Sequence, residues 1–362
     1  MAHNKNQHYV PKGLLKPFTK NEEGISLEML LIRSGKIQSD VSVSSQCSKP
    51  YFYGSDPKLE NAIQAMETQY GVARNSIVDG SFLPKDIDQA TFLNRFILFQ
   101  HYRTLSSLQH NAEAMVLMRE GLSRMPGSDI EPLPDERTLT QFAMRAYVQN
   151  MPMLDDLAIC LIRNETDLDF VVGDNPVVHT NRWQLQRMKR QHFGPGHAGA
   201  IFFLPISPRV AAMGYDGDVY HVPKIAGWLR LSRRKDADVV NMLQFSNARA
   251  AIYFSATSNR EAILSQYRRF QAEWPQRLRA HTLRVAQLKE ENEEYKEYLV
   301  LSEGEAPKEN ELLVHVQQQH AQIPTWPKFL KYRSKPTYFD TNSGRGQIRH
   351  HTRIWHNGVD WA

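Results

Sequence analysis

Four segments of the chain carry side chains suited to acid–base chemistry and to binding phosphate. The polar residues of these segments are Gln7, His8 and Tyr9; Glu60 and Glu67; Gln100, Arg103 and Thr104; and Asp174 and Asn175. Imidazole and carboxylate groups transfer protons or hold a divalent cation, whereas a guanidinium binds phosphate and stabilises the negative charge that develops on it. This combination is typical of a hydrolase that acts on phosphodiester bonds.

We expect four of these residues to be catalytic: His8, Glu67, Arg103 and Asp174. A cation such as Mg²⁺ or Mn²⁺ would be bound by carboxylates, because hard cations prefer oxygen ligands, and the candidate ligands are Glu60, Glu67 and Asp174. The candidate substrate-binding residues are Gln7, Tyr9, Gln100, Thr104 and Asn175. Buried polar groups need shared partners, so the four catalytic candidates should converge on one point.

Each of these side chains also has a structural interpretation. His8 could bond to the backbone, Arg103 could form a buried pair with the Asp174 turn, and Asp174 could cap that turn. The chain would then be a non-catalytic module that binds or regulates nucleic acid or protein, and the polar residues would form a structural network. Paired side chains without a cavity would favour this alternative, whereas an open cleft beside them would favour the enzyme.

Other reaction classes have weaker support in the sequence. A metal-independent ribonuclease would use an Arg and a His one or two helical turns apart, and three pairs have that spacing: Arg103 and His110, Arg187 and His192, and Arg345 and His350. No G-x-S-x-G motif marks a serine nucleophile, and no G-x-x-x-x-G-K-[ST] motif marks a phosphate-binding loop. Hydrolysis of nucleic acid or nucleotides is therefore the favoured function, as in a nuclease-type toxin or phage-defence effector.

The hydrophobic periodicity of the chain predicts the elements that position these residues. Helices are expected at 57–79, 86–122, 136–150, 234–250 and 258–300, and a hairpin of two strands is expected to turn at Ser34-Gly35-Lys36. Short β-rich runs between 157 and 222 are separated by turn residues, which suits an antiparallel sheet. The predicted fold class is α+β, with a helical layer packed on a mostly antiparallel sheet and a C-terminal helical and basic extension.

The predicted elements place the polar residues on common faces. Glu60 and Glu67 are seven residues apart, so they share one face of the first long helix. The three polar residues between 100 and 104 share a face of the second helix through spacings of three and four residues. Asp174 follows an apolar run at the end of an expected strand, and Pro176 constrains the turn behind it.

The chain divides into a body and a C-terminal appendage. A single α+β domain is expected over residues 1–300, followed by a linker with a short helix at 301–323 and a basic, aromatic tail at 324–362. Cations that neutralise phosphates, interleaved with aromatic rings that stack on bases, are typical of surfaces that bind single-stranded nucleic acid. The candidate residues for binding RNA or DNA are Lys328, Lys331, Arg333, Arg349 and Arg353. Alternatively, the aromatic residues pack on the body and the charges are solvated.

The composition indicates a soluble globular protein. Of the 362 residues, 41% are apolar and 23% are charged, and the net charge is +5. Only two cysteines occur, Cys47 and Cys160, and neither has metal-ligand spacing to a second Cys or a His, which fits the reducing cytoplasm. We expect neither a secretory signal nor a membrane-spanning segment, because no apolar run approaches about 18 residues.

Six motifs occur in an order that resembles one protein family. They are "QHYVPKGLLKPF", "LENAIQAMETQYG", "RFILFQHYRT", "DFVVGDNPVV", "FLPISP" and "VVNMLQFSNARAAIYFS". Over about residues 5–257 the chain resembles the DUF4238 family, a domain of unknown function. The resemblance implies that the characteristic polar positions of the family are Gln7, His8, Tyr9, Pro11, Glu60, Glu67, Gln100, Arg103, Thr104, Asp174, Asn175, Pro176 and Asn241. The family often has Ser where this chain has Gly173, and its name implies no activity.

Overall fold

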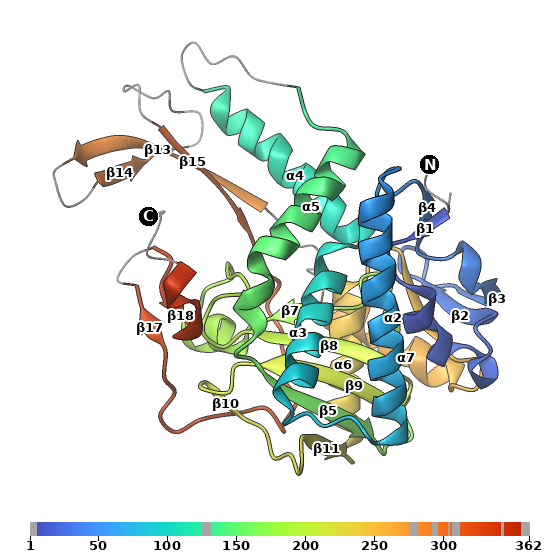
Figure 1. Cartoon of the computed structure of the whole chain (residues 1–362). Coiled ribbons are helices and arrows are strands. Elements are labelled where there is room, and N and C mark those ends of the chain that lie inside the picture. The colour runs from blue at the N-terminus through green and yellow to red at the C-terminus, as the bar shows by residue number, and fades with distance from the viewer. Residues whose placement is uncertain are drawn as a thin grey trace.

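Two sheets form the centre of the molecule (Figure 1). The structure is a computed structural model, which describes residues 6–124, 132–274, 281–291, 296–302, 305, 312–341 and 344–355. The larger sheet has the order β11-β5-β9-β8-β7, with β5 (Ala158–Asn164), β7 (Val178–Thr180), β8 (Ile201–Ser207), β9 (Val210–Tyr215) and β11 (Trp228–Leu231). Strand β11 runs parallel to β5, and the other neighbours in this sheet are antiparallel.

The second sheet is antiparallel and has the order β3-β2-β12-β6. Its strands are β2 (Ser26–Leu31), β3 (Ile37–Ser42), β6 (Val172–Gly173) and β12 (Ala251–Phe254). The predicted hairpin is confirmed, because β2 and β3 pair across a turn in which Gly35 has a φ of 65°, a left-handed conformation that glycine adopts without strain.

Helices cover both faces of the central sheets. α2 (Pro57–Asp79), α3 (Ile87–Tyr102) and α5 (Glu136–Asn150) lie on one face, and α6 (Arg234–Asn247) and α7 (Arg260–Glu273) lie on the other (Figure 1). Every residue of β8 is buried: Phe202 and Leu204 pack in the core on the α3 side, whereas their neighbours Ile201 and Phe203 pack on the α6 side. The predicted α+β class with a mostly antiparallel sheet is confirmed, and the sheet is covered on two faces.

The helix expected at 86–122 is divided into two. α3 ends at Tyr102, and Thr104 has an extended conformation (φ −81°, ψ 156°) before α4 (Leu105–Leu122) begins. The Thr104 hydroxyl accepts a hydrogen bond from the backbone N–H of Ser107 at 3.1 Å, which caps α4. The chain therefore changes direction at Arg103, and this residue lies at a helix end.

The helix expected at 258–300 ends at Glu273, and the prediction is wrong for residues 281–291 and 296–300; residues 275–280 and 292–295 lie outside the described residues. Pro275 follows α7 in the sequence, and a proline disfavours the helical conformation of the residue before it. A third sheet with the order β14-β13-β15 follows, formed by β13 (His281–Glu291), β14 (Lys296–Val300) and β15 (Leu312–Gln318). Strand β15 also replaces the short helix expected at 301–323, because cross-strand pairing outweighs the local helix propensity. Residues 303–304 and 306–311 of the expected linker lie outside the described residues.

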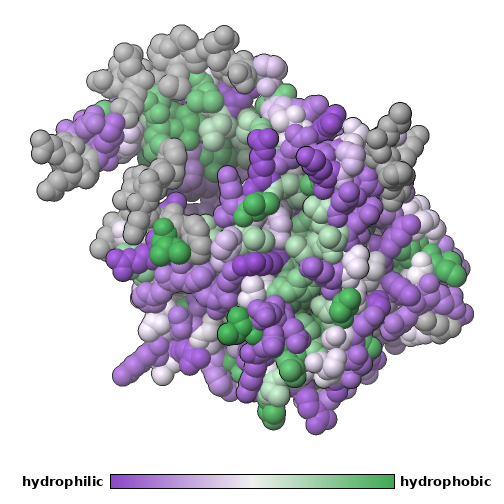
Figure 2. Space-filling view, in the orientation of Figure 1, coloured by the Kyte–Doolittle hydropathy of each residue, from purple (hydrophilic) through white to green (hydrophobic). Residues whose placement is uncertain are grey.

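The third sheet packs against α4 and projects from the body (Figure 1). Gly121 of α4 permits the close approach, since a Cβ atom there would lie 2.5 Å from the side chain of Val314 and 2.9 Å from that of Leu283. Figure 2 shows apolar side chains gathered on this projecting part, which includes the exposed Leu299 and Val300.

Part of the expected tail, within residues 324–341 and 344–355, packs along the body. Trp326, Phe329 and Leu330 are buried in the core on the α6 side. Three further antiparallel strand pairs are formed by β1 (Asn6–His8) with β4 (Ser48–Pro50), β10 (Tyr220–His221) with β16 (Lys331–Tyr332), and β17 (Phe339–Asp340) with β18 (Gln347–Ile348). Trp326 therefore follows the alternative interpretation of the tail, in which its aromatic residues pack on the body. Residues 356–362 lie outside the described residues. Among the helices that are described, none combines the length and apolar character needed to span a membrane.

A row of amide side chains on α6 holds the segment that contains Asp174. Asn241, Gln244 and Asn247 are three residues apart, so they share one helix face. Asn241 accepts a hydrogen bond from the N–H of Val171, and Gln244 accepts one from the N–H of Gly173. Asn241, like Asn175, is thus engaged in holding the backbone.

Candidate functional site

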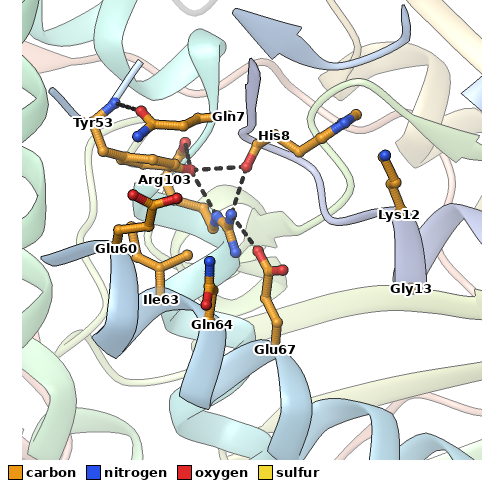
Figure 3. A pocket seen from close by; sticks show the side chains of 10 residues that line it. All are labelled: Gln7, His8, Lys12, Gly13, Tyr53, Glu60, Ile63, Gln64, Glu67 and Arg103. Carbon is orange, nitrogen blue, oxygen red and sulfur yellow. Dashed lines mark hydrogen bonds and ion pairs between the residues drawn. The ribbon is translucent and has the colours of Figure 1, made fainter. Parts of the chain in front are cut away.

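A pocket of about 190 Å³ lies where β1 meets α2 and the end of α3 (Figure 3). The short helix α1 (Lys12–Leu15) forms another side of it. Its lining residues are Gln7, His8, Lys12, Gly13, Tyr53, Glu60, Ile63, Gln64, Glu67 and Arg103. Segments that are separated by up to about one hundred residues in the sequence thus bring His8, Glu60, Glu67 and Arg103 together.

Arg103 occupies the centre of the pocket and is buried, with 1% of its surface exposed. Its Nε donates a hydrogen bond to the hydroxyl of Tyr53 at 2.8 Å. Its Nη2 donates to the backbone oxygen of His8 and to Oε1 of Glu67, both at 2.6 Å. Its Nη1 is buried and has no hydrogen-bond partner among the described residues. The described residues therefore satisfy Nε and Nη2 of the guanidinium and provide no hydrogen-bond partner for Nη1.

Three polar side chains on one face of α2 line the pocket. Glu60, Gln64 and Glu67 are spaced by four and three residues, and Figure 3 shows all three pointing from the helix toward Arg103. Glu67 forms the ion pair, whereas Glu60 is 8% exposed and its Oε1 has no hydrogen-bond partner within the described part of the chain. The face that Glu60 and Glu67 were expected to share is confirmed.

His8 presents a neutral imidazole at the opposite side of the pocket. Its Nδ1 lies 3.1 Å from the backbone oxygen of Gln46, and a carbonyl oxygen only accepts, so Nδ1 carries the proton and Nε2 has a free lone pair. Burial, followed by the positive charge of Lys12 and then that of Arg103, lowers the pKa of His8 to about 4, although the hydrogen bond to the backbone of Gln46 acts in the opposite direction. Figure 3 shows the ring pointing away from Arg103 and toward Lys12. At neutral pH His8 can accept a proton or bind a metal through Nε2.

Asp174 does not line this pocket. Its carboxylate accepts hydrogen bonds from the backbone N–H groups of Arg249 at 2.9 Å and Ala250 at 2.8 Å, and burial raises its pKa. The buried pair suggested between Arg103 and Asp174 is replaced by the pair of Arg103 with Glu67. Glu60, Glu67 and Asp174 also do not form a three-ligand metal group in the described residues. Asp174 thus binds the backbone of a neighbouring turn, which agrees with the structural interpretation of this residue.

The predicted substrate-binding residues are largely engaged by the protein itself. Gln7 accepts a hydrogen bond from the backbone N–H of Tyr53 and donates one to the backbone oxygen of Gly54. Gln100 donates to the backbone oxygen of Tyr9. Thr104 donates to the side chain of Asn175, which in turn donates to the backbone oxygen of Asn247. Tyr9 packs on Phe52 with ring centroids 5.3 Å apart, and burial followed by the neighbouring Cys47 raises its pKa. These contacts fix the N-terminal segment to α3, and of this set Gln7 alone lines the pocket.

The pocket also contains three polar residues that the sequence analysis did not select. Lys12 contributes positive charge next to His8, Tyr53 binds Arg103, and Gln64 completes the polar face of α2. The spacing of Gln64, four residues after Glu60, is a signal that could have identified it. The contact of Tyr53 with Arg103 spans 50 residues and has no sequence signal.

The predicted nucleic-acid-binding residues are divided between the surface and the interior. Lys328, Lys331, Arg333 and Arg353 are exposed. Arg349 is 2% exposed, and its guanidinium donates to Asp156 at 2.8 Å and to the backbone oxygens of Met153 and Pro195. The prediction for Arg349 is therefore corrected, because a buried and satisfied guanidinium is not accessible to a phosphate.

One comparison with known proteins gives a match. The family model described as "Protein of unknown function (DUF4238)" matches residues 6–258, a range that contains every residue lining the pocket. No curated protein and no solved structure matches the chain.

Proposed function

We propose that this chain, which belongs to the DUF4238 family, hydrolyses phosphodiester bonds of nucleic acid or nucleotides in the pocket around Arg103. The observation that carries the proposal is the buried guanidinium whose Nη1 has no protein partner in the described residues. Buried polar groups are nearly always hydrogen-bonded, so this atom is expected to bind a ligand. A phosphate fits best, because guanidinium groups form strong, charge-assisted hydrogen bonds to phosphate oxygens.

Two more polar atoms of the pocket support a ligand rather than a closed network. Nε2 of His8 and Oε1 of Glu60 are also buried without a hydrogen-bond partner in the described residues. An acceptor nitrogen, an acceptor oxygen and a donor nitrogen around one pocket match a bound phosphate with a water molecule beside it. The open pocket beside the Arg103 pair supports the enzyme over the closed structural network.

The residues of the pocket divide the reaction between them. Arg103 and Lys12 would bind the phosphoryl oxygens and stabilise the charge that develops on them. His8 would take a proton from the attacking water at Nε2 while the water oxygen forms a bond to phosphorus and the bond to the leaving oxygen breaks. Glu60 and Glu67 would bind Mg²⁺ or Mn²⁺ together with the substrate phosphate, since Mg²⁺ is commonly bound by one or two carboxylates plus phosphate oxygens.

Two cationic surfaces support a polyanionic partner such as RNA or DNA. A groove of about 430 Å³ is lined by Arg230, Arg233, Lys328 and Lys331 and by one carboxylate, Asp236, among other residues. A larger cavity of about 830 Å³ lies beside the third sheet, and its lining includes Arg284, Lys296 and Arg345, His192, His197 and His315, and one carboxylate, Glu297. Positive clefts attract nucleic acid without sequence preference. The two free, buried cysteines support the proposed cytoplasmic location.

The test combines a panel of substrates with one conservative variant. Purified protein would be incubated with single-stranded RNA, single-stranded DNA and dinucleotides, with Mg²⁺, with Mn²⁺ and with chelator. Glu60→Gln keeps the shape of a side chain that has an unpartnered oxygen, and Glu120→Gln on the exposed face of α4 is the matched control. We expect hydrolysis by the wild type and by the control, and a loss of at least about 10-fold in Glu60→Gln.

Two outcomes would overturn the proposal. Equal hydrolysis by the wild type and by Glu60→Gln would show that the reaction occurs elsewhere. Binding of RNA or DNA that depends on the pocket residues, without turnover under any metal condition, would establish the non-catalytic binding module instead.

A further inference from the structure

A second group of ligand-type side chains lies where the third sheet meets α4. It consists of His110 and Glu113 on α4 and His281, the first residue of β13. Their ligand atoms lie within 4.8 Å of one another. Among the described residues, this is the one set of three His, Cys, Asp or Glu side chains close enough to hold a metal ion. The side chains of His110 and His281 are 11% and 6% exposed, whereas that of Glu113 is 47% exposed.

From this geometry we infer a binding site for a divalent transition metal ion, Zn²⁺ in the first instance. Oε2 of Glu113 lies 3.5 Å from Nδ1 of His110 and 3.5 Å from Nδ1 of His281. Zinc binds His nitrogen and carboxylate oxygen at 2.0–2.2 Å, so neighbouring ligand atoms of a tetrahedral site are about 3.3–3.6 Å apart. Both distances to Oε2 fall in this interval.

The types of ligand distinguish this site from the proposed hydrolytic pocket. Two imidazoles and one carboxylate favour Zn²⁺ and related transition metals, whereas Mg²⁺ prefers oxygen ligands alone. Three protein ligands leave the fourth tetrahedral position for water or another ligand. The partial exposure of Glu113 gives an ion access from solvent.

Arg249 holds the carboxylate in the orientation that the site needs. Its Nη2 lies 3.0 Å from Oε1 of Glu113, which leaves Oε2 directed at the two histidines. The same nitrogen lies 3.3 Å from both ring nitrogens of His110. Partners of this kind commonly orient metal ligands.

The site joins a part of the chain that the family model matches to a part that it does not match. His110 and Glu113 lie within the range of the family match, whereas His281 lies beyond its end at residue 258. A bound ion would connect β13 to α4, two elements that also meet where Gly121 approaches Leu283. We therefore expect the ion to stabilise the attachment of the third sheet to the body, because a ligand that binds only the folded state raises its stability.

The test measures the binding of Zn²⁺ by calorimetry and the absorption spectrum of bound Co²⁺. Metal-free full-length protein should bind one ion, and the melting temperature should rise with Zn²⁺ concentration. His281→Ala and His110→Ala should weaken binding by at least about 100-fold and remove the rise in melting temperature. His315→Ala is the matched control, since His315 lies in β15 of the same sheet, and it should bind as the wild type does.

Several results would refute the site. One is the absence of saturable Zn²⁺ binding to the wild type, and another is binding that is unchanged in His110→Ala and His281→Ala. If a variant fails to fold, Glu113→Gln supplies the same test, because it removes the charge of the shared ligand but retains its shape. The readouts involve no hydrolysis, so they do not depend on the proposed reaction.

Discussion

The buried guanidinium of Arg103 pairs with a carboxylate from a different helix: its Nη2 lies 2.6 Å from Oε1 of Glu67. The side chain of Arg103 is fully buried, whereas that of Glu67 is 31% exposed at the pocket. Tyr53 and the backbone of His8 bind the guanidinium on the protein side, and the exposed part of the ion pair is the Glu67 carboxylate, which faces the pocket.

The ion pair should stabilise the folded protein, because Glu67 neutralises the buried charge of Arg103. Glu67→Gln leaves Arg103 buried without a counter-charge, and we expect the free energy of unfolding to fall by about 2–4 kcal/mol. Urea denaturation of Glu67→Gln, Arg103→Met and the double variant measures this. The double variant should lose less than the sum of the two single losses, by about 1–3 kcal/mol, because the residues are in contact. Simple additivity of the two losses would contradict the coupling.

Replacing Glu60 should reduce hydrolysis but, unlike replacing Glu67, should not lower the free energy of unfolding. Its buried Oε1 has no partner among the described residues, so Glu60→Gln removes the cost of burying that charge. We expect the free energy of unfolding to stay within about 1 kcal/mol of the wild-type value or to increase, while hydrolysis decreases. Parallel denaturation and activity measurements check both quantities. A large loss of stability would mean that Glu60 has a structural role.

His8 should make stability depend on pH below neutrality. Its pKa is about 4 in the folded state, below its ordinary value of 6.5, so between these values the unfolded chain binds more protons. The free energy of unfolding should then fall as the pH is lowered from 6.5 toward 4. His8→Asn retains a donor for the backbone of Gln46 but does not titrate. The difference in urea midpoint between wild type and variant should change over this pH range, and a constant difference would exclude the effect.

The exposed lysines of the C-terminal segment should affect nucleic-acid binding without affecting the fold. Lys328→Ala with Lys331→Ala should weaken binding to single-stranded RNA and reduce the slope of log affinity against log salt by about 1.4, since each phosphate contact contributes about 0.7. The melting temperature should not change. Fluorescence anisotropy at several salt concentrations measures the slope, and an unchanged slope would remove these residues from the interface.

Trp326 provides the complementary test of the same segment. Its side chain is 7% exposed and packs in the core on the α6 side, so Trp326→Ala should lower the free energy of unfolding by about 3–5 kcal/mol. The affinity of the remaining folded protein for RNA should be close to that of the wild type. A variant with normal stability would mean that the segment does not belong to the folded body.

Local interactions made several features of this protein predictable from the sequence. The bounds of α2 agree with the prediction because its end signals are local: Asp56 caps the first turn, and Gly80 ends the helix with a φ of 83°. The shared face of Glu60 and Glu67 follows from helical periodicity alone. The ordered motifs identified the family, and the family match at residues 6–258 agrees with the expected range of 5–257.

Contacts between distant residues were decided by the tertiary structure. Whether Arg103 pairs with Glu67 or with Asp174 depends on how α2 crosses the end of α3, which neither helix encodes by itself. The burial of Arg349 depends on its ion pair with Asp156, 193 residues earlier in the chain. Residues 281–291 form a strand because β15 pairs with them, although the periodicity of the sequence predicted a helix there. Local propensity is worth a fraction of a kcal/mol per residue, so packing and pairing across the fold determine these outcomes.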